Sequence, residues 1–216
     1  MKLKKEDLLL YAVTDRSWNK IMSLYEQVEC ALKGGVTLVQ YREKELTGDL
    51  FVSEAMKIKE LCHKYKVPFI INDNVDAALQ CGADGVHVGQ DDMPVCEIRN
   101  LAGDDFIIGT TAKTVLQAVK AEADGADYLG VGAVFPSPTK GNAIRITKET
   151  LSQICNSVEI PVAAIGGITA ANMSEIAGSG ISGMALVSAI FAADDIESET
   201  AELKSKVLQI VKAPRK

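Results

Sequence analysis

The stretch Tyr128-Leu-Gly-Val-Gly-Ala-Val-Phe-Pro-Ser-Pro-Thr-Lys-Gly141 begins as a buried strand and ends as a polar loop. Its first half is apolar and rich in glycine, and Phe135 is its last large apolar side chain. Ser137, Thr139 and Lys140 then place two hydroxyls and an ammonium within four residues. Oxyanions bind where donors and positive charge are preorganised. The stretch therefore predicts a phosphate-binding loop after a buried strand, although a solvated loop can have this composition by chance.

Seven further short runs rich in Val and Ile resemble the first half of this stretch. With it, they cover residues 8–14, 37–41, 69–72, 85–89, 106–110, 128–132, 162–165 and 184–187. Each run is too short and too continuously apolar for a one-sided antiparallel strand, which indicates parallel strands buried on both faces. Apolar residues at helical spacing predict helices at 21–33, 50–65 and 196–211. Thr114-Val-Leu-Gln117 is typical of a capping box, and Thr169 is a candidate N-cap.

Glycines mark the ends of the segments between these runs. A glycine stops the predicted helix before every second strand, at Gly35, Gly82, Gly125 and Gly180. This repeat favours a TIM (β/α)8 barrel that forms one domain over residues 1–216. The rival fold, an open doubly wound sheet, usually has a glycine-rich turn after its first strand. Here Thr14-Asp-Arg-Ser-Trp18 follows the first strand, without glycine.

The composition narrows the partners of the protein. The 216 residues carry a net charge of −6 and contain no Lys/Arg run longer than two, which argues against nucleic acid. Apolar stretches fall far short of the roughly 20 residues that span a bilayer, and no signal peptide is apparent. The five cysteines are odd in number and form no C-x-x-C pair, so we expect free thiols in a cytoplasmic protein. The composition is compatible with a homo-oligomer as well as with a monomer.

Polar side chains follow the predicted strands, where a barrel carries its active site. Arg42 and Lys44 follow the second strand, Thr111 ends the fifth, and the loop with Lys140 follows the sixth. Together they offer more donors than a phosphate monoester needs, which points to pyrophosphate. Arg42 could instead pair with a neighbouring glutamate on the surface.

Two further groups at the strand ends suggest a metal ion and a second anion. Asp73 and Asp92 end neighbouring strands amid basic residues, and Mg²⁺ takes one or two carboxylates together with phosphate oxygens. Either aspartate could also be a helix N-cap. Gly166-Gly167, with Ser188 opposite, matches the phosphate site common after strands seven and eight of barrels. Gln40 and His87 could simply hydrogen-bond inside the barrel.

Taken together, these residues resemble the thiamine-phosphate synthase family over nearly the whole chain. The matching motifs are Val39-Gln-Tyr-Arg-Glu-Lys44, Ile71-Asn-Asp73, Gly85-Val-His-Val-Gly-Gln-Asp-Asp92, Gly130-Val-Gly-Ala-Val-Phe-Pro-Ser-Pro-Thr-Lys140 and Ala164-Ile-Gly-Gly-Ile-Thr169. The resemblance implies a TIM barrel that joins hydroxymethylpyrimidine diphosphate to thiazole phosphate and releases pyrophosphate with Mg²⁺. It also implies a dissociative mechanism, in which pyrophosphate leaves before the thiazole nitrogen attacks.

The resemblance also assigns roles to individual residues. It implies that the diphosphate is held by Arg42, Lys44, Thr111, Ser137, Thr139 and Lys140, of which Arg42, Thr111 and Lys140 are expected to act in catalysis. It implies that Asp73 and Asp92 ligate Mg²⁺ and that Gln40 and Asn72 contact the pyrimidine. It implies that Gly167 and Ser188 hold the thiazole phosphate and that Val187 is a further substrate contact.

One position departs from the family pattern. Family members usually carry Gly-x-Ser-x-His after the fifth strand, whereas this chain has Gly109-Thr-Thr-Ala-Lys113. The related thiazole tautomerase, an isomerase on the same barrel, depends on that histidine and lacks much of the diphosphate-binding set. Because Lys113 stands there and the set is complete, we expect the synthase rather than the tautomerase. A non-catalytic barrel that binds a phosphorylated ligand is a third alternative.

Overall fold

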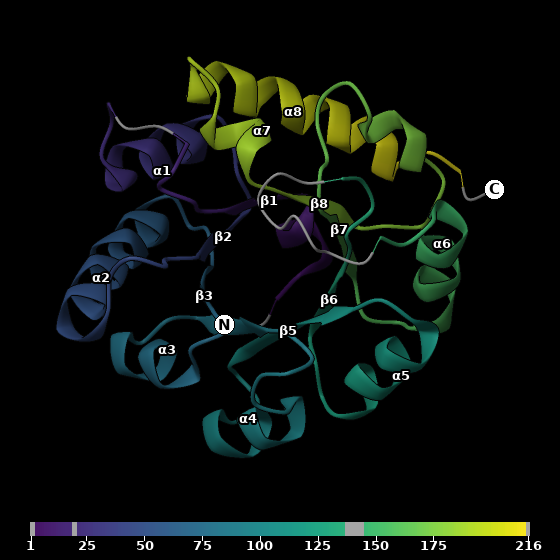
Figure 1. Cartoon of the computed structure of the whole chain (residues 1–216), viewed down its shortest axis with the longest axis horizontal. Coiled ribbons are helices and arrows are strands. Elements are labelled where there is room, and N and C mark those ends of the chain that lie inside the picture. The colour runs from purple at the N-terminus through teal and green to yellow at the C-terminus, as the bar shows by residue number, and fades with distance from the viewer. Residues whose placement is uncertain (1–2, 19–20, 137–144, 215–216) are drawn as a thin grey trace.

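The computed structural model, which describes residues 3–18, 21–136 and 145–214, is a closed barrel of eight parallel strands. The strands follow one another around the barrel in chain order, and the helices surround them (Figure 1). Their bounds are β1 (Leu10–Val13), β2 (Leu38–Tyr41), β3 (Phe69–Asn72), β4 (Gly85–Val88), β5 (Ile107–Ala112), β6 (Tyr128–Gly132), β7 (Val162–Ile165) and β8 (Gly183–Leu186). The predicted TIM barrel is confirmed, and the predicted bounds of β3, β6 and β7 are the observed ones.

Helices lie between successive strands over most of the chain. The α-helices are α1 (Leu24–Lys33), α2 (Gly48–Lys64), α3 (Val75–Cys81), α4 (Val95–Ala102), α5 (Val115–Ala123), α6 (Lys148–Ser157), α7 (Ser188–Phe191) and α8 (Ile196–Val211). Two 3-10 helices are η1 (Lys5–Leu8) and η2 (Met173–Ile176). The first predicted helix begins three residues late, at Leu24, because the Ser23 hydroxyl caps it by accepting a hydrogen bond from the Glu26 N–H.

Of the two predicted caps, one is confirmed and one is wrong. The Thr114 hydroxyl accepts a hydrogen bond from the Gln117 N–H at the start of α5. The predicted capping box does not form, because the Gln117 side chain accepts from the Lys113 N–H instead of the Thr114 N–H. Thr169 begins no helix, since only the short η2 follows β7 and Asn172 precedes it. The Asn172 side chain instead accepts a hydrogen bond from the Thr169 N–H, at 2.8 Å. A local side-chain turn therefore takes the place of the expected helix start.

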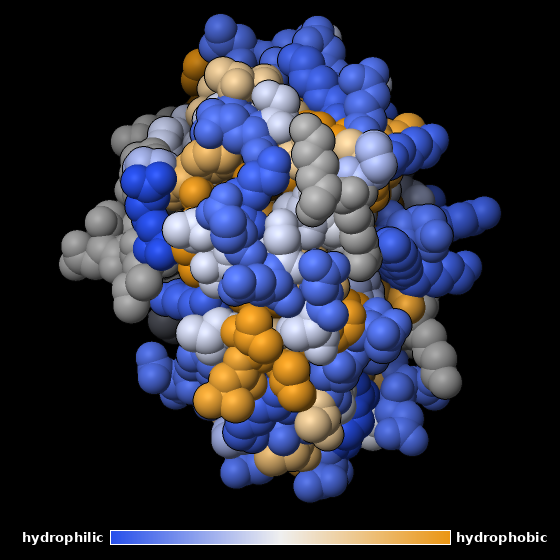
Figure 2. Space-filling model, turned by 90° about the vertical axis from the view of Figure 1, so that its right-hand side faces the viewer, coloured by the Kyte–Doolittle hydropathy of each residue, from blue (hydrophilic) through white to orange (hydrophobic). Residues whose placement is uncertain are grey.

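The strands are buried on both faces, as their continuous apolar character predicts. One set of side chains fills the barrel interior, where Tyr11, Leu38, Ile70 and Tyr128 form part of one core cluster. The other set packs against the surrounding helices in a second, larger cluster. The outer surface on the α5–α6 side is mostly hydrophilic, with a small apolar patch (Figure 2). No helix among the described residues is long and apolar enough to cross a membrane.

Candidate active site

A cavity of about 350 Å³ opens among the carboxyl ends of the strands. Many of the residues singled out from the sequence line it: Gln40, Arg42, Asn72, Asp73, Asp92, Thr111 and Val187. These side chains come from five different strands or from the loops that follow them, and the barrel brings them to one end because all its strands are parallel. The predicted gathering of strand-end residues is therefore observed.

Arg42 directly follows β2 and is held by two residues that follow β1. Its guanidinium Nη1 lies 3.2 Å from Asp15 Oδ2, and only 9% of the Arg42 side chain is exposed. The backbone of Arg42 is bonded to the Thr14 hydroxyl, which accepts from its N–H at 2.9 Å and donates to its carbonyl at 3.1 Å. Arg42 is thus a nearly buried cation in the cavity wall, and the surface pairing with a neighbouring glutamate is not seen.

The glutamate beside it, Glu43, pairs with Arg16 instead. Arg16 also contacts Glu54 at 2.5 Å, and Glu54 accepts a hydrogen bond from the Tyr41 hydroxyl at 2.7 Å. Burial opposes ionisation of Glu43, but bonds from the Glu45 N–H and from Arg16 outweigh it and lower the pKa of Glu43 below its ordinary value. No pattern in the sequence predicts this cluster, because its members are far apart in the chain.

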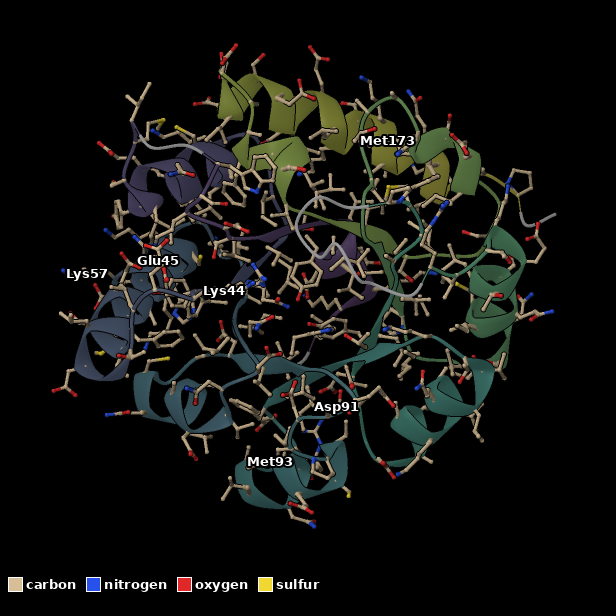
Figure 3. All side chains as sticks on the ribbon, in the orientation of Figure 1. Lys44, Glu45, Lys57, Asp91, Met93 and Met173 are labelled. Carbon is tan, nitrogen blue, oxygen red and sulfur yellow. The ribbon has the colours of Figure 1, made fainter. Side chains whose placement is uncertain are left out.

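Lys44 stands outside the central cavity. It is exposed and lines an adjoining cavity of about 580 Å³, which it shares with Arg42, Asn72 and Asp73. Figure 3 shows Lys44 and Asp91 closer to the barrel mouth than Lys57, which lies on the outer side of α2. Lys44 can therefore reach an anion that extends from the cavity toward β2 and β3.

Three exposed aspartates line the cavity, and two of them, Asp73 and Asp92, are each oriented by a local hydrogen bond. Asp73 has a left-handed backbone (φ 62°), and its Oδ2 accepts from the Asn72 side chain at 2.6 Å. Asp92 Oδ2 accepts from the Gly89 N–H at 2.7 Å. Neither aspartate is a helix N-cap, because Asn74 precedes α3 and Pro94 precedes α4. That alternative is wrong, and both carboxylates face the cavity.

These oxygens suit a hard cation that keeps other oxygen ligands. Among the described residues, no group of three or more His, Cys, Asp or Glu side chains could enclose a metal ion. A site for Zn²⁺ usually needs three or four such ligands, whereas Mg²⁺ binds through one or two carboxylates and substrate phosphates. Asp73 and Asp92 therefore fit Mg²⁺.

The far side of the cavity is formed by β4 and β5. His87 is 7% exposed, and its Nε2 lies 3.1 Å from the Thr111 hydroxyl. The Gln90 side chain donates to the Thr111 carbonyl at 2.6 Å, and the half-buried Lys113 also lines the cavity. The interpretation of His87 as a hydrogen-bonded residue inside the barrel is confirmed, and the structure adds that it faces the cavity.

The glycines after β7 lie against the start of the loop after β6. The Phe135 N–H donates to the Gly166 carbonyl at 3.0 Å, and a Cβ on Gly167 would meet the Pro136 carbonyl oxygen at 2.2 Å. Gly166 lines the cavity, whereas Gly167 and Ser188 are direct neighbours of lining residues. Ser137, Thr139 and Lys140 lie outside the described residues, so their predicted contacts stay predictions.

A family model, curated relatives and a solved structure share one kind of name. The sequence matches the family model described as thiamine monophosphate synthase over residues 10–190. It is 47% identical to the thiamine-phosphate synthase of Clostridium acetobutylicum, over 91% of this chain and 93% of that protein. It is 48% identical to the thiamine-phosphate synthase of Methanobrevibacter smithii, over 87% and 89%. The solved thiamine phosphate pyrophosphorylase from Pyrococcus furiosus superposes with a TM-score of 0.88 at 37% identity, over 95% of this chain and 98% of that one.

Proposed function

This chain belongs to the thiamine monophosphate synthase family and is an enzyme that forms thiamine phosphate, and we propose that it does so from two phosphorylated substrates. They are 4-amino-2-methyl-5-hydroxymethylpyrimidine diphosphate and 4-methyl-5-(2-phosphoethyl)thiazole, and pyrophosphate is released. The observation that carries this proposal is the cavity in which a nearly buried arginine, three aspartates and amide side chains meet.

Each part of the cavity suits one part of these substrates. Gln40 and Asn72 offer amide groups to the aminopyrimidine, and Arg42, Lys44 and Thr111 offer donors to its diphosphate. The backbone around Gly166 and Gly167, with Val187 and Ser188 across from it, would receive the thiazole phosphate. The reacting carbon and nitrogen would then meet between β2 and β7, above the barrel interior.

The residues present favour a dissociative reaction. The carbon–oxygen bond to the diphosphate breaks first, the electron pair leaves with pyrophosphate, and the aminopyrimidine delocalises the positive charge of the methylene group. The thiazole nitrogen then supplies the electron pair of the new carbon–nitrogen bond. Such a step needs neutralisation of the leaving group and positioning of the acceptor, rather than a nucleophilic side chain. Arg42 and Lys140 are proposed for that neutralisation, and the Thr111 hydroxyl is proposed to donate a hydrogen bond to the leaving group.

Mg²⁺ is proposed as the metal cofactor, held by Asp73 and Asp92. When bound, it would add positive charge to the diphosphate oxygens and so ease departure of pyrophosphate. The hydrogen bonds from Asn72 and Gly89 orient the two carboxylates before the metal arrives. We also place the protein in the cytoplasm, a proposal supported by its five free cysteines, which fit a reducing compartment.

A product assay tests this function. The purified chain, given both substrates and Mg²⁺, should form thiamine phosphate and pyrophosphate in equal amounts, and chelation of the metal by EDTA should stop the reaction until Mg²⁺ is restored. Chromatography for thiamine phosphate and an enzymatic assay for pyrophosphate measure the two products. Isomerisation of a thiazole phosphate without any condensation would instead identify a tautomerase, and the proposed reaction would be wrong.

A further inference from the structure

Five polar side chains form a continuous row of hydrogen bonds beneath the cavity. The Gln40 amide donates to the Tyr11 hydroxyl, and the Tyr11 and Tyr128 hydroxyl oxygens lie 2.9 Å apart. Tyr128 Oη lies 3.0 Å from His87 Nδ1, and His87 Nε2 lies 3.1 Å from the Thr111 hydroxyl. The two ends of this row, Gln40 and Thr111, line the cavity, whereas both tyrosines belong to the barrel interior.

The barrel has room for this row because two strands carry glycine where it passes. A Cβ on Gly109 would lie 2.3 Å from the Tyr128 hydroxyl oxygen, and a Cβ on Gly130 would lie 2.9 Å from His87 Cε1. Tyr11 and Tyr128 are 1% and 0% exposed. Burial raises the pKa of both phenols above the ordinary value, so each hydroxyl keeps its hydrogen.

The row has a direction, because each buried hydroxyl carries one hydrogen that needs an acceptor. With its nitrogen toward Tyr11, the Gln40 amide can only donate there, so Tyr11 would give its hydrogen to Tyr128, and Tyr128 would give its own to His87 Nδ1. His87 then carries its hydrogen on Nε2 and donates to the Thr111 oxygen. Because the Thr111 oxygen accepts from His87, the Thr111 hydroxyl hydrogen is directed to a different acceptor. An anion bound in the cavity would be that acceptor.

If the hydrogen bonds of the row ran in the opposite direction, the roles of Gln40 and Thr111 toward the cavity would both be reversed. If the Gln40 amide were turned, its oxygen would accept from Tyr11, the row would run from His87 to Gln40, and His87 Nε2 would accept the Thr111 hydrogen. Thr111 could then no longer donate to an anion, and Gln40 would present N–H groups to the cavity. The row therefore couples the hydrogen-bonding character of two groups that stand on different strands.

We propose that Tyr128 is a positioning residue that, through Tyr11 and His87, fixes Gln40 as an acceptor and Thr111 as a donor toward the substrate. This inference rests on the proposed function, in which Gln40 faces the aminopyrimidine and Thr111 faces the departing diphosphate. An acceptor selects the amino group of that ring, and a fixed donor stabilises the leaving group. Tyr128 touches neither substrate and acts only through its two neighbours in the row.

Removing one hydroxyl at a time distinguishes the effect of the row on Gln40 from its effect on Thr111. Tyr128→Phe interrupts the row at its centre, so kcat should fall about tenfold and KM for the pyrimidine diphosphate should rise. Tyr11→Phe leaves the Tyr128–His87–Thr111 half in place. It should therefore raise KM for the pyrimidine diphosphate about tenfold with kcat near that of the wild type. KM for the thiazole phosphate should stay unchanged in both variants.

A double variant tests whether Tyr128 acts through Thr111. Steady-state kinetics with both substrates and Mg²⁺ would compare Tyr128→Phe in the wild type and in a Thr111→Val background, where the fall in kcat should disappear. Tyr41→Phe is the matched control, because its hydroxyl is also buried but bonds Glu54 on the helix side. It should lower the melting temperature comparably and leave the kinetic constants unchanged.

The outcomes distinguish this inference from the function on which it rests. An equal fall in kcat in both backgrounds, no fall at all, or the same kinetic change in Tyr41→Phe would overturn the positioning role while wild-type turnover persists. Failure of the wild type itself to form thiamine phosphate from these substrates would overturn the proposed function, and the inference with it.

Discussion

Arg42→Ala lowers kcat/KM for the pyrimidine diphosphate by about 10³-fold, the upper range for losing one group that stabilises developing charge. The reason is that Arg42 is a cation already held at the cavity wall by Asp15 and by the Thr14 hydroxyl, with its side chain nearly out of water. A charge so placed needs little rearrangement when the diphosphate departs. Steady-state kinetics with saturating thiazole phosphate measure the effect.

Arg42→Lys is the matched variant for this result. It keeps the positive charge but loses the planar, forked donors that bind two phosphate oxygens at once, so its kcat/KM should fall between those of the wild type and Arg42→Ala. Melting temperatures separate lost catalysis from lost folding, since Asp15 loses its partner in the alanine variant. A fully active Arg42→Ala protein would show that the diphosphate binds elsewhere.

Lys140→Ala should lower kcat by about 10²- to 10³-fold while the protein stays folded. This lysine closes the sequence Ser137-Pro-Thr-Lys140, which follows the last described residue of the loop after β6. The start of that loop lies against Gly166 and Gly167 at the cavity edge, so its polar residues are expected to reach the leaving group. Single-turnover kinetics measure the chemical step directly.

Lys206→Ala is the control for Lys140→Ala. Lys206 lies on α8, on the outside of the barrel, with 45% of its side chain exposed, and it pairs with Glu202 at 3.9 Å. Its loss changes the net charge by the same amount and should leave kcat unchanged. Equal rates in the two variants would remove Lys140 from the diphosphate site.

The barrel could be predicted from the sequence because each buried parallel strand is a short run of apolar residues. Runs such as 128–132 are apolar at every position, and their length and spacing are those of βα units. The carboxyl ends of such strands must meet at one end of a barrel, so the positions of Arg42, Asp73 and Thr111 in the chain are enough to group them. The cap predicted at Thr169 is wrong because its N–H bonds the Asn172 side chain, and a short 3-10 helix replaces the expected one.

The contacts between strands could not be predicted in the same way. Asp15 and Arg42 are adjacent only because β1 and β2 pair, and Tyr11 reaches Tyr128 across the barrel interior. From the sequence, Gly130 is only a strand position without a side chain. In the barrel, the absence of a side chain there leaves the space that His87 occupies. Such contacts depend on side-chain directions inside a closed barrel, which no local pattern in the sequence encodes.

We propose that one anion site, between β2 and the loop after β6, holds the departing diphosphate. A crystal structure of the protein with pyrophosphate and Mg²⁺ tests it most directly. We expect one pyrophosphate within hydrogen-bond distance of both Arg42 and Lys140, with Mg²⁺ between it and Asp73 and Asp92. Pyrophosphate bound only at Gly166 and Gly167, away from Arg42, would show that this anion site does not hold the diphosphate.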